Sequence, residues 1–262
     1  MTEETKNQIN CIISNSNCDL SIIVKQINED DRIYEYNSGK KLISASLIKI
    51  PILLAILEKV KQGDISLNDT VLIREEEILE DTRVFEFGTR NYTLLELLNW
   101  MIITSDNTAT NTLIKKFGIK YINDYMEKEL QLKETTIQRK MLDFNAIEKG
   151  CQNYTNQEDM LTIFTKLFHK EILTNDLCDI AIKILSKQRC QDQVMRYIYE
   201  DVFYAHKTGS LDYLNHDVGV MKINNNLFYL GISIFNCKEK EGNKELIGKI
   251  GKLIFDDLKY NI

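Results

Sequence analysis

The chain predicts β-strands near both of its ends and helices between them. Five segments predict strands, at 18–28, 31–38, 201–210, 216–224 and 226–236: Tyr34 and Tyr36 alternate with polar residues in the second, and the last three are rich in strand-forming residues. A short polar run at 224–226, "NNN", predicts the turn between the last two. The simplest arrangement joins the strands from both ends in one antiparallel sheet, with the middle of the chain as an insertion.

The residues between these strands predict an all-helical insertion. From Leu67 to Gln193 the apolar spacing is mostly helical, and Thr93 with Glu96 predicts a capping box. Helices are also predicted at 3–14 and 244–260.

The predicted fold class is therefore α/β (α+β), an antiparallel sheet built from both chain ends, flanked by helices and carrying an inserted helical domain. A sheet domain of 1–45 plus 198–262 and a helical domain of 46–197 would form one discontinuous catalytic unit. The chain has one proline and no low-complexity linker, which argues against independent tandem domains.

Composition excludes several classes of protein. The 262 residues carry a net charge of −6, and the lysines are scattered, so we expect no nucleic-acid partner. No apolar run is long enough for a transmembrane helix, and no membrane partner is expected. The polar N-terminus lacks a secretory pattern, which predicts a cytoplasmic protein as written, or a secreted one if a leader was removed. We expect a monomer that acts on a small molecule.

The six cysteines form no C-x-x-C pair, and the three histidines are too dispersed for a finger-type zinc site. We therefore expect no metal or other cofactor. Free, mostly buried thiols are the favoured interpretation. A disulfide between Cys11 and Cys18 is an alternative that would need an oxidising compartment.

The stretch "SASLIKIPILLAIL", residues 44–57, places Ser46 three residues before Lys49 at the start of an apolar run. The run predicts a buried helix, on which positions i and i+3 share a face. Ser46 and Lys49 could then act as a nucleophile and its base. The same spacing at Ser38 and Lys41 lies in a Gly-containing turn. A capping serine with a snorkelling lysine gives the same pattern, so this stretch alone leaves both interpretations open.

Two further motifs favour the catalytic interpretation. "SDN" at Ser105–Asn107 follows a predicted helix, and "KTG" at Lys207–Gly209 lies on the first C-terminal strand. S-x-x-K, S-D-N and K-T-G in this order are typical of class A β-lactamases and penicillin-binding proteins. Over about 18–260 the chain resembles that family of serine hydrolases. The resemblance implies a β-lactamase/transpeptidase-like fold with the active site between the sheet and the helical domain.

The resemblance also implies four catalytic residues. Ser46 would attack the substrate carbonyl, and Lys49 would take its proton. Burial and the neighbouring Lys207 would lower the pKa of Lys49, which makes it a usable base. Ser105 would pass a proton to the leaving nitrogen.

Four residues are expected to bind the substrate. Asn107 would donate to the amide side chain of the substrate, and Thr208 would hold its carboxylate together with Lys207. Gly209 would let the substrate lie beside the strand as an added strand. The backbone N–H of Ser210 would form the oxyanion hole with that of the nucleophile.

One expected residue is missing. The family places a glutamate two residues after an arginine and four before an asparagine, and this glutamate activates the water that releases the acyl-enzyme. Here "RKMLDFN" retains Arg139 and Asn145 but has Met141 at the glutamate position. Asp143 and Glu148 are the nearest carboxylates, and Asp143 is the possible substitute.

These residues predict an enzyme that forms an acyl-enzyme on Ser46 with β-lactam antibiotics and releases it slowly. A penicillin-binding peptidase or esterase acting on another acyl donor is an alternative. A β-lactam-binding or sensor protein without turnover is a third possibility, because the residue expected to drive deacylation is absent.

Overall fold

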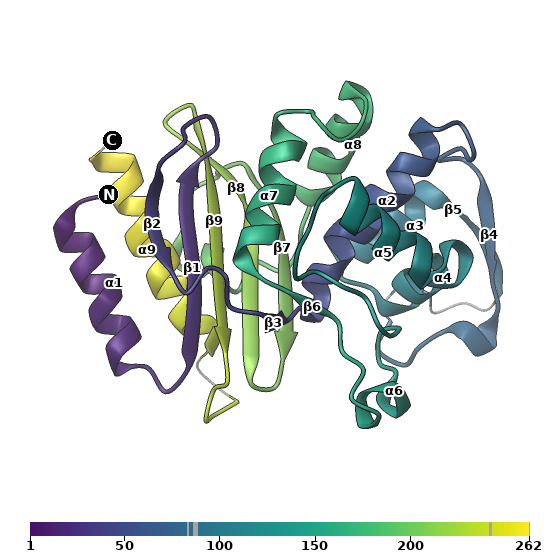
Figure 1. Cartoon of the computed structure of the whole chain (residues 1–262), viewed down its shortest axis with the longest axis horizontal. Coiled ribbons are helices and arrows are strands. Elements are labelled where there is room, and N and C mark those ends of the chain that lie inside the picture. The colour runs from purple at the N-terminus through teal and green to yellow at the C-terminus, as the bar shows by residue number, and fades with distance from the viewer. Residues whose placement is uncertain (83, 86–88, 241–242, 262) are drawn as a thin grey trace.

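The central sheet is built from both ends of the chain, as predicted. The computed structural model describes residues 1–261 except 83, 86–88 and 241–242. Five antiparallel strands lie in the order β2-β1-β9-β8-β7, so β7 forms one edge (Figure 1). The strands are β1 Asp19–Gln26, β2 Arg32–Tyr36, β7 Tyr204–Leu211, β8 Leu214–Ile223 and β9 Asn226–Phe235. The predicted fold class is confirmed.

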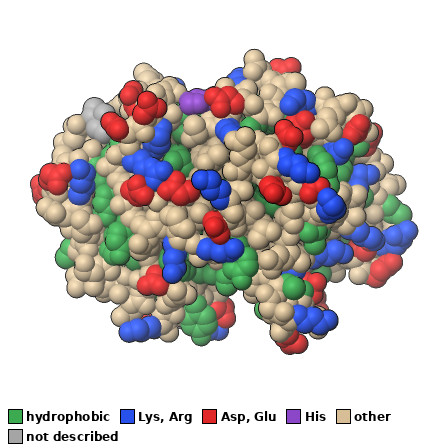
Figure 2. Space-filling model, viewed as in Figure 1, with side chains coloured by type: hydrophobic (Ala, Val, Ile, Leu, Met, Phe, Trp, Pro, Cys, Tyr) green, Lys and Arg blue, Asp and Glu red, His purple; other side chains and the backbone are tan. Residues whose placement is uncertain are grey.

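Helices cover both faces of the sheet. Helix α1, Glu3–Asn15, packs with α9, Asn243–Tyr260, on one face, where a separate apolar core forms. Helices α7, Gln157–Phe168, and α8, Asn175–Leu185, contact the other face (Figure 1). Figure 2 shows positive and negative side chains mixed over one side of the molecule, as the scattered charges of the sequence predict.

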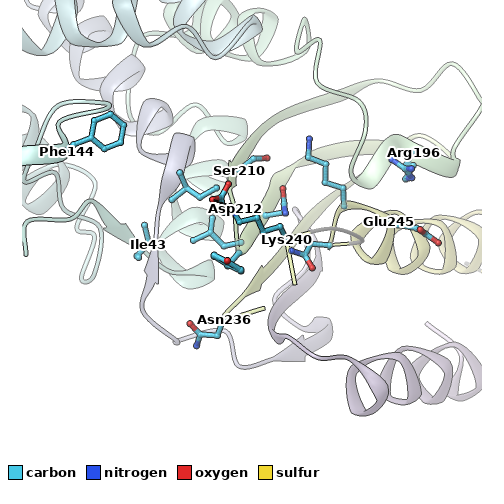
Figure 3. Close-up of a pocket in the computed structure, with 14 residues that line it drawn as sticks. Ile43, Phe144, Arg196, Ser210, Asp212, Asn236, Lys240 and Glu245 are labelled. Atoms are coloured by element: carbon cyan, nitrogen blue, oxygen red, sulfur yellow. Dashed lines mark hydrogen bonds and ion pairs between the residues drawn. The ribbon is translucent and has the colours of Figure 1, made fainter. Parts of the chain in front are cut away.

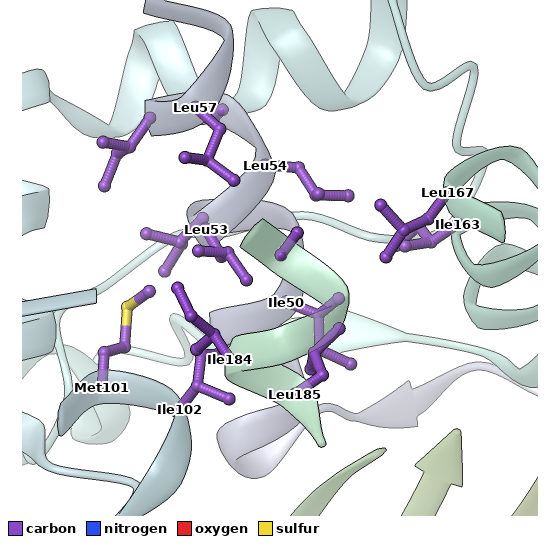
Figure 4. Close-up of a cluster of buried hydrophobic side chains, with 14 of the residues drawn as sticks. Ile50, Leu53, Leu54, Leu57, Met101, Ile102, Ile163, Leu167, Ile184 and Leu185 are labelled. Atoms are coloured by element: carbon purple, nitrogen blue, oxygen red, sulfur yellow. The ribbon is translucent and has the colours of Figure 1, made fainter. Parts of the chain in front are cut away.

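A buried helix, α2, Lys49–Lys61, forms the centre of the helical region. Its residues 49–58 are all buried, as the continuous apolar run predicts, and other helices surround it (Figure 4). The remaining helical elements are η1 Ala45–Ile48, η2 Glu75–Glu77, α3 Leu94–Ile103, α4 Asn107–Phe117, α5 Ile119–Lys128, α6 Phe144–Glu148 and η3 Val194–Tyr197. None of the described helices is long and apolar enough to cross a membrane. The domain boundaries at 45/46 and 197/198 stay a prediction.

Short strands interrupt the helical region, which the sequence did not predict. Strand β4, Thr70–Ile73, pairs with β5, Arg90–Thr93, and β3, Leu42–Ile43, pairs with β6, Tyr154–Thr155. Segments of two to four residues show too little alternation to be distinguished from helix or loop. Of these two pairs, β3–β6 adjoins η1, because β3 ends just before η1 begins.

The prediction that all six cysteines are free, mostly buried thiols was wrong. Cys18 and Cys237 form a disulfide, and Cys11 is a free, exposed thiol. Strands β1 and β9 pair with Asp19 opposite Phe235, which brings the residues just beyond them together. The two cysteines are 219 residues apart, so sequence spacing gave no sign of this pair. Of the thiols that remain free, Cys178 is buried.

Gly219 of β8 lies opposite His206 of β7, and the strands leave no room there for a side chain. A Cβ at Gly219 would overlap the Ala205 carbonyl oxygen and lie 2.6 Å from His206 Cα. Gly219→Ala should therefore displace β7 and lower the free energy of unfolding by about 1–3 kcal/mol, as overpacking does. Urea unfolding followed by circular dichroism measures this change.

Gly39→Ala is the matched control, because a Cβ there would meet no described heavy atom within 4 Å. Its free energy of unfolding should stay within about 0.5 kcal/mol of the wild type. Equal unfolding midpoints for both variants would contradict the close approach of β7 and β8.

Candidate active site

Ser46 lies in η1, a single tight turn that continues directly into α2. Its side chain is half-buried, and the preceding residue, Ala45, has a φ of 44°. A left-handed backbone is rare for alanine, and such strain concentrates at functional sites. The fold therefore leaves Ser46 half-buried at the start of a helix while it buries the residues on both sides of it.

Lys49 is fully buried and donates to three oxygen atoms. Its Nζ lies 2.6 Å from the Ser105 carbonyl oxygen, 3.2 Å from Ser105 Oγ and 2.7 Å from Asn107 Oδ1. Burial, with a further contribution from the charge of Lys207, holds the pKa of Lys49 well below its usual value. Among the described residues Ser46 is not a hydrogen-bond partner of Lys49, although it lies three residues before it.

Ser105 lies between two lysines. Its Oγ accepts from Lys49 at 3.2 Å and from Lys207 at 3.0 Å. A hydroxyl has two acceptor positions and one hydrogen, so these contacts leave its O–H free to donate elsewhere. Ser105 also has a φ of 57°, a second left-handed residue beside the predicted site.

Two carboxylates to which the sequence analysis gave no role support this loop, namely Asp106 inside the S-D-N motif and Asp81 outside it. Asp106 is the N-cap of α4 and accepts from Ala109 N at 2.7 Å and from Thr82 Oγ1. Asn107 Nδ2 donates to Asp81 Oδ2 at 2.6 Å, while its Oδ1 accepts from Lys49. The S-D-N motif therefore holds Lys49, and Asn107 Nδ2 has a second N–H besides the one that Asp81 accepts. No motif in the sequence around Asp81 would have identified it as a partner of this loop.

Strand β7 brings the K-T-G motif to the same place. Lys207 is fully buried, donates to Ser105 Oγ and to the Thr208 carbonyl oxygen at 2.8 Å, and its pKa is lowered by burial to about 8. A Cβ at Gly209 would lie 3.2 Å from Ala45 Cβ and 3.3 Å from the Ser44 carbonyl oxygen. Glycine therefore lets η1, the turn that holds Ser46, approach β7, the strand that holds the exposed Ser210.

The loop that carries Met141 at the position of the expected glutamate is fixed to α4. Asn111 Oδ1 accepts from Met141 N at 2.7 Å, and its Nδ2 donates to the Met141 carbonyl oxygen at 3.0 Å. Asn111 lies one helical turn after Asn107, which contacts Lys49. Met141 is thus held near the predicted site. Asp143 is the N-cap of α6, and its Oδ1 accepts from Ala146 N at 3.0 Å.

A cavity of about 1060 Å³ adjoins the predicted site at Ser210 (Figure 3). It is lined by Ser210 but by none of the other predicted site residues, so it borders the predicted site at that residue and does not contain it. In Figure 3, Phe144 of α6 lies at the opposite side of the view from Arg196 and Glu245. The described residues contain no cluster of three or more side chains suited to a metal ion.

Known proteins resemble this chain along nearly its whole length. A β-lactamase from Bacteroides uniformis is 24% identical over 277 residues, which cover 98% of this chain and 92% of the relative. β-Lactamase VEB-1 from Pseudomonas aeruginosa is 23% identical and covers 97% of this chain and 90% of the relative.

Solved structures agree on the fold. A β-lactamase from Chitinophaga pinensis has a TM-score of 0.90 and 20% identity, covering 97% of this chain and 99% of that one. The structure of PBP-A has a TM-score of 0.86 and 23% identity, covering 97% and 95%. The model of the β-lactamase enzyme family matches residues 4–258. The chain therefore belongs to the β-lactamase enzyme family.

Proposed function

We propose that the protein is a serine hydrolase that β-lactams acylate on Ser46 and that releases the acyl group slowly. One observation carries this proposal: Ser105 Oγ accepts from both Lys49 and Lys207, beside the turn that holds Ser46. A base, a proton donor and a cation for the substrate carboxylate are thus held together in one connected set of hydrogen bonds.

Acylation follows from these positions. The depressed pKa of Lys49 favours its neutral form, which takes the proton of Ser46 Oγ as the oxygen attacks the lactam carbonyl carbon. An Oγ–C bond forms, and the backbone N–H groups of Ser46 and Ser210 stabilise the oxyanion. The C–N bond then breaks, and Ser105 donates its proton to the leaving nitrogen and regains one from Lys49.

The substrate contacts are proposed on the same geometry. Lys207 and Thr208 hold the substrate carboxylate, and the remaining N–H of Asn107 donates to the substrate amide. Because β7 is an edge strand, the substrate can lie beside Gly209 as an added strand. This edge position also favours the second candidate function, a penicillin-binding peptidase or esterase that acts on an extended acyl donor.

Slow release follows from the side chain at position 141. Asn111 holds the backbone of Met141 one helical turn from the Lys49 contact, but a thioether cannot take a proton from water. Asp143 is the nearest substitute in sequence, and its carboxylate is engaged as a helix cap. A leucine-to-glutamate variant of PBP-A was solved as an acyl-enzyme complex with penicillin G. We propose the same class of covalent complex for this chain.

The compartment and the oligomeric state are also proposals. The Cys18–Cys237 disulfide favours an oxidising compartment over the cytoplasm, because structural disulfides persist mainly outside reducing compartments. We propose that the chain acts as a monomer.

Ser46→Ala should abolish covalent labelling by a fluorescent penicillin, because no other residue is proposed to attack the lactam. Gel fluorescence after denaturation measures the adduct. Ser38→Ala is the matched control, because it removes the other serine with the S-x-x-K spacing and should leave labelling unchanged. Labelling that survives in Ser46→Ala would reject the assignment of the nucleophile.

Met141→Glu should accelerate release of the acyl group by roughly 10²-fold or more, the contribution typical of a general base. Mass spectrometry of samples quenched at successive times gives the rate at which the adduct disappears. Met141→Gln is the control of equal size without a base, and it should release no faster than the wild type. Equal rates for the two variants would contradict the proposed cause of slow release.

A further inference from the structure

His216 is a fully buried side chain of β8 to which the proposed mechanism gives no role. Its Nε2 lies 2.9 Å from the carbonyl oxygen of Ile43. A carbonyl oxygen can only accept, so Nε2 carries the hydrogen and donates it. Burial lowers the pKa of the imidazole to about 4, which keeps the ring neutral near pH 7. Because a neutral imidazole has one N–H, His216 commits its ring donor to Ile43.

Ile43 ends the strand that leads into the turn of the nucleophile. Strand β3 pairs with β6 in a two-stranded sheet of its own, and η1 begins two residues after Ile43. The position of β3 and η1 relative to β7 and β8 therefore depends on contacts outside the ladder of the central sheet. The hydrogen bond from His216 is one such contact, and it joins the central sheet to the backbone just before Ser46.

The imidazole and the turn also pack against the same glycine. His216 lies opposite Gly209 in the register of β7 and β8. A Cβ at Gly209 would lie 3.3 Å from His216 Cδ2 and 3.2 Å from Ala45 Cβ. Gly209 directly precedes Ser210, and Ser210 and Ile43 line the same cavity (Figure 3). His216 thus lies where the nucleophile turn and the end of β7 meet.

The turn needs support from its surroundings because its backbone is strained. Ala45 has a φ of 44°, and such conformations persist only where neighbouring contacts over-determine them. On one side, the Ser44 N–H donates to the Asn153 carbonyl oxygen at 2.8 Å, which ties the turn to the segment before β6. On the other side, the bond from His216 to Ile43 ties the turn to the central sheet.

We propose that His216 is a positioning residue that sets the nucleophile turn against β7, so that the backbone N–H groups of Ser46 and Ser210 converge on one oxyanion. The inference rests on the proposed function, because the oxyanion hole is part of it. The two donors belong to elements far apart in the sequence, and a displacement of about 1 Å can cost roughly 10²-fold in rate. His216 therefore acts on the chemical step and not on the affinity for the substrate.

His216→Leu removes the donor and keeps a side chain in the space. The limiting rate of acylation by a penicillin, measured by stopped flow over a range of drug concentrations, should fall by roughly 10²-fold. The dissociation constant of the complex that precedes acylation should stay close to the wild-type value. His216→Gln can place an amide N–H near the position of Nε2 and should restore most of the limiting rate. His169→Leu, the same substitution at the end of α7, is the matched control and should change neither quantity.

The ester carbonyl stretch of the acyl-enzyme is a readout that a merely structural role would not move. Hydrogen bonds from an oxyanion hole lower this frequency, so it should rise in His216→Leu and not in His216→Gln. Infrared difference spectra with a penicillin that carries ¹³C at the lactam carbonyl isolate the band. A folded His216→Leu variant with the wild-type limiting rate and carbonyl frequency would overturn the proposal.

A second variant keeps the test decisive if His216→Leu does not fold. His216→Asn has a side chain too short to reach Ile43, and it should show the same loss of rate and the same shift in frequency. Wild-type values in a folded His216→Asn variant would overturn the proposal. Failure of both variants to fold would assign His216 to stability and would also overturn it.

The hydrogen bond itself can be tested without a substrate. Long-range ¹H–¹⁵N spectra at pH 7 should show His216 protonated on Nε2 and unprotonated on Nδ1, and the opposite tautomer would overturn the proposal. If the wild type forms no adduct with a penicillin, the proposed function is wrong, and the tautomer still decides whether His216 holds the nucleophile turn. If the adduct forms and acylation of His216→Leu is unchanged, only the role of His216 is wrong.

Discussion

Two buried lysine side chains share one serine hydroxyl, and much of the structure serves to make this arrangement possible. Lys49 and Lys207 are both fully buried, and each donates to Ser105 Oγ. Removing a charge from water costs several kcal/mol unless hydrogen bonds replace the lost solvation. The surroundings meet this cost with the Ser105 carbonyl oxygen, Asn107 Oδ1 and the Thr208 carbonyl oxygen. The remaining cost lowers the pKa of both lysines. A lowered pKa suits Lys49 to act as a base, and it makes Lys207 a cation that loses its proton more readily than an exposed lysine.

The fold holds these groups from two sides. Helix α2 fixes Lys49 within the helical region, and β7 fixes Lys207 at the edge of the sheet. The S-D-N loop reaches between them, and its conformation depends on the left-handed backbone of Ser105 and the cap formed by Asp106. Because the two lysines come from opposite ends of the chain, the site exists only when the sheet and the helices are packed together.

Much of this arrangement was predictable from the sequence, and the rest was not, for physical reasons. The three motifs identified the residues that meet at Ser105, and the apolar run after Ser46 predicted a buried helix. Long-range pairings gave no local pattern. The Cys18–Cys237 disulfide, the contact of Asn111 with Met141 and the buried His216 all depend on strand register or loop packing. Short strands such as β4 carry too few residues to show a period.

Intact-protein mass spectrometry after mixing with a penicillin, with consumption of the drug followed in parallel, tests the central claim most directly. The account predicts an adduct on the wild-type chain that forms and persists while little further drug is consumed. An adduct that disappears as the drug is consumed would contradict slow release and would require a base other than residue 141. The absence of both an adduct and drug loss would contradict the assignment of β-lactams as acyl donors.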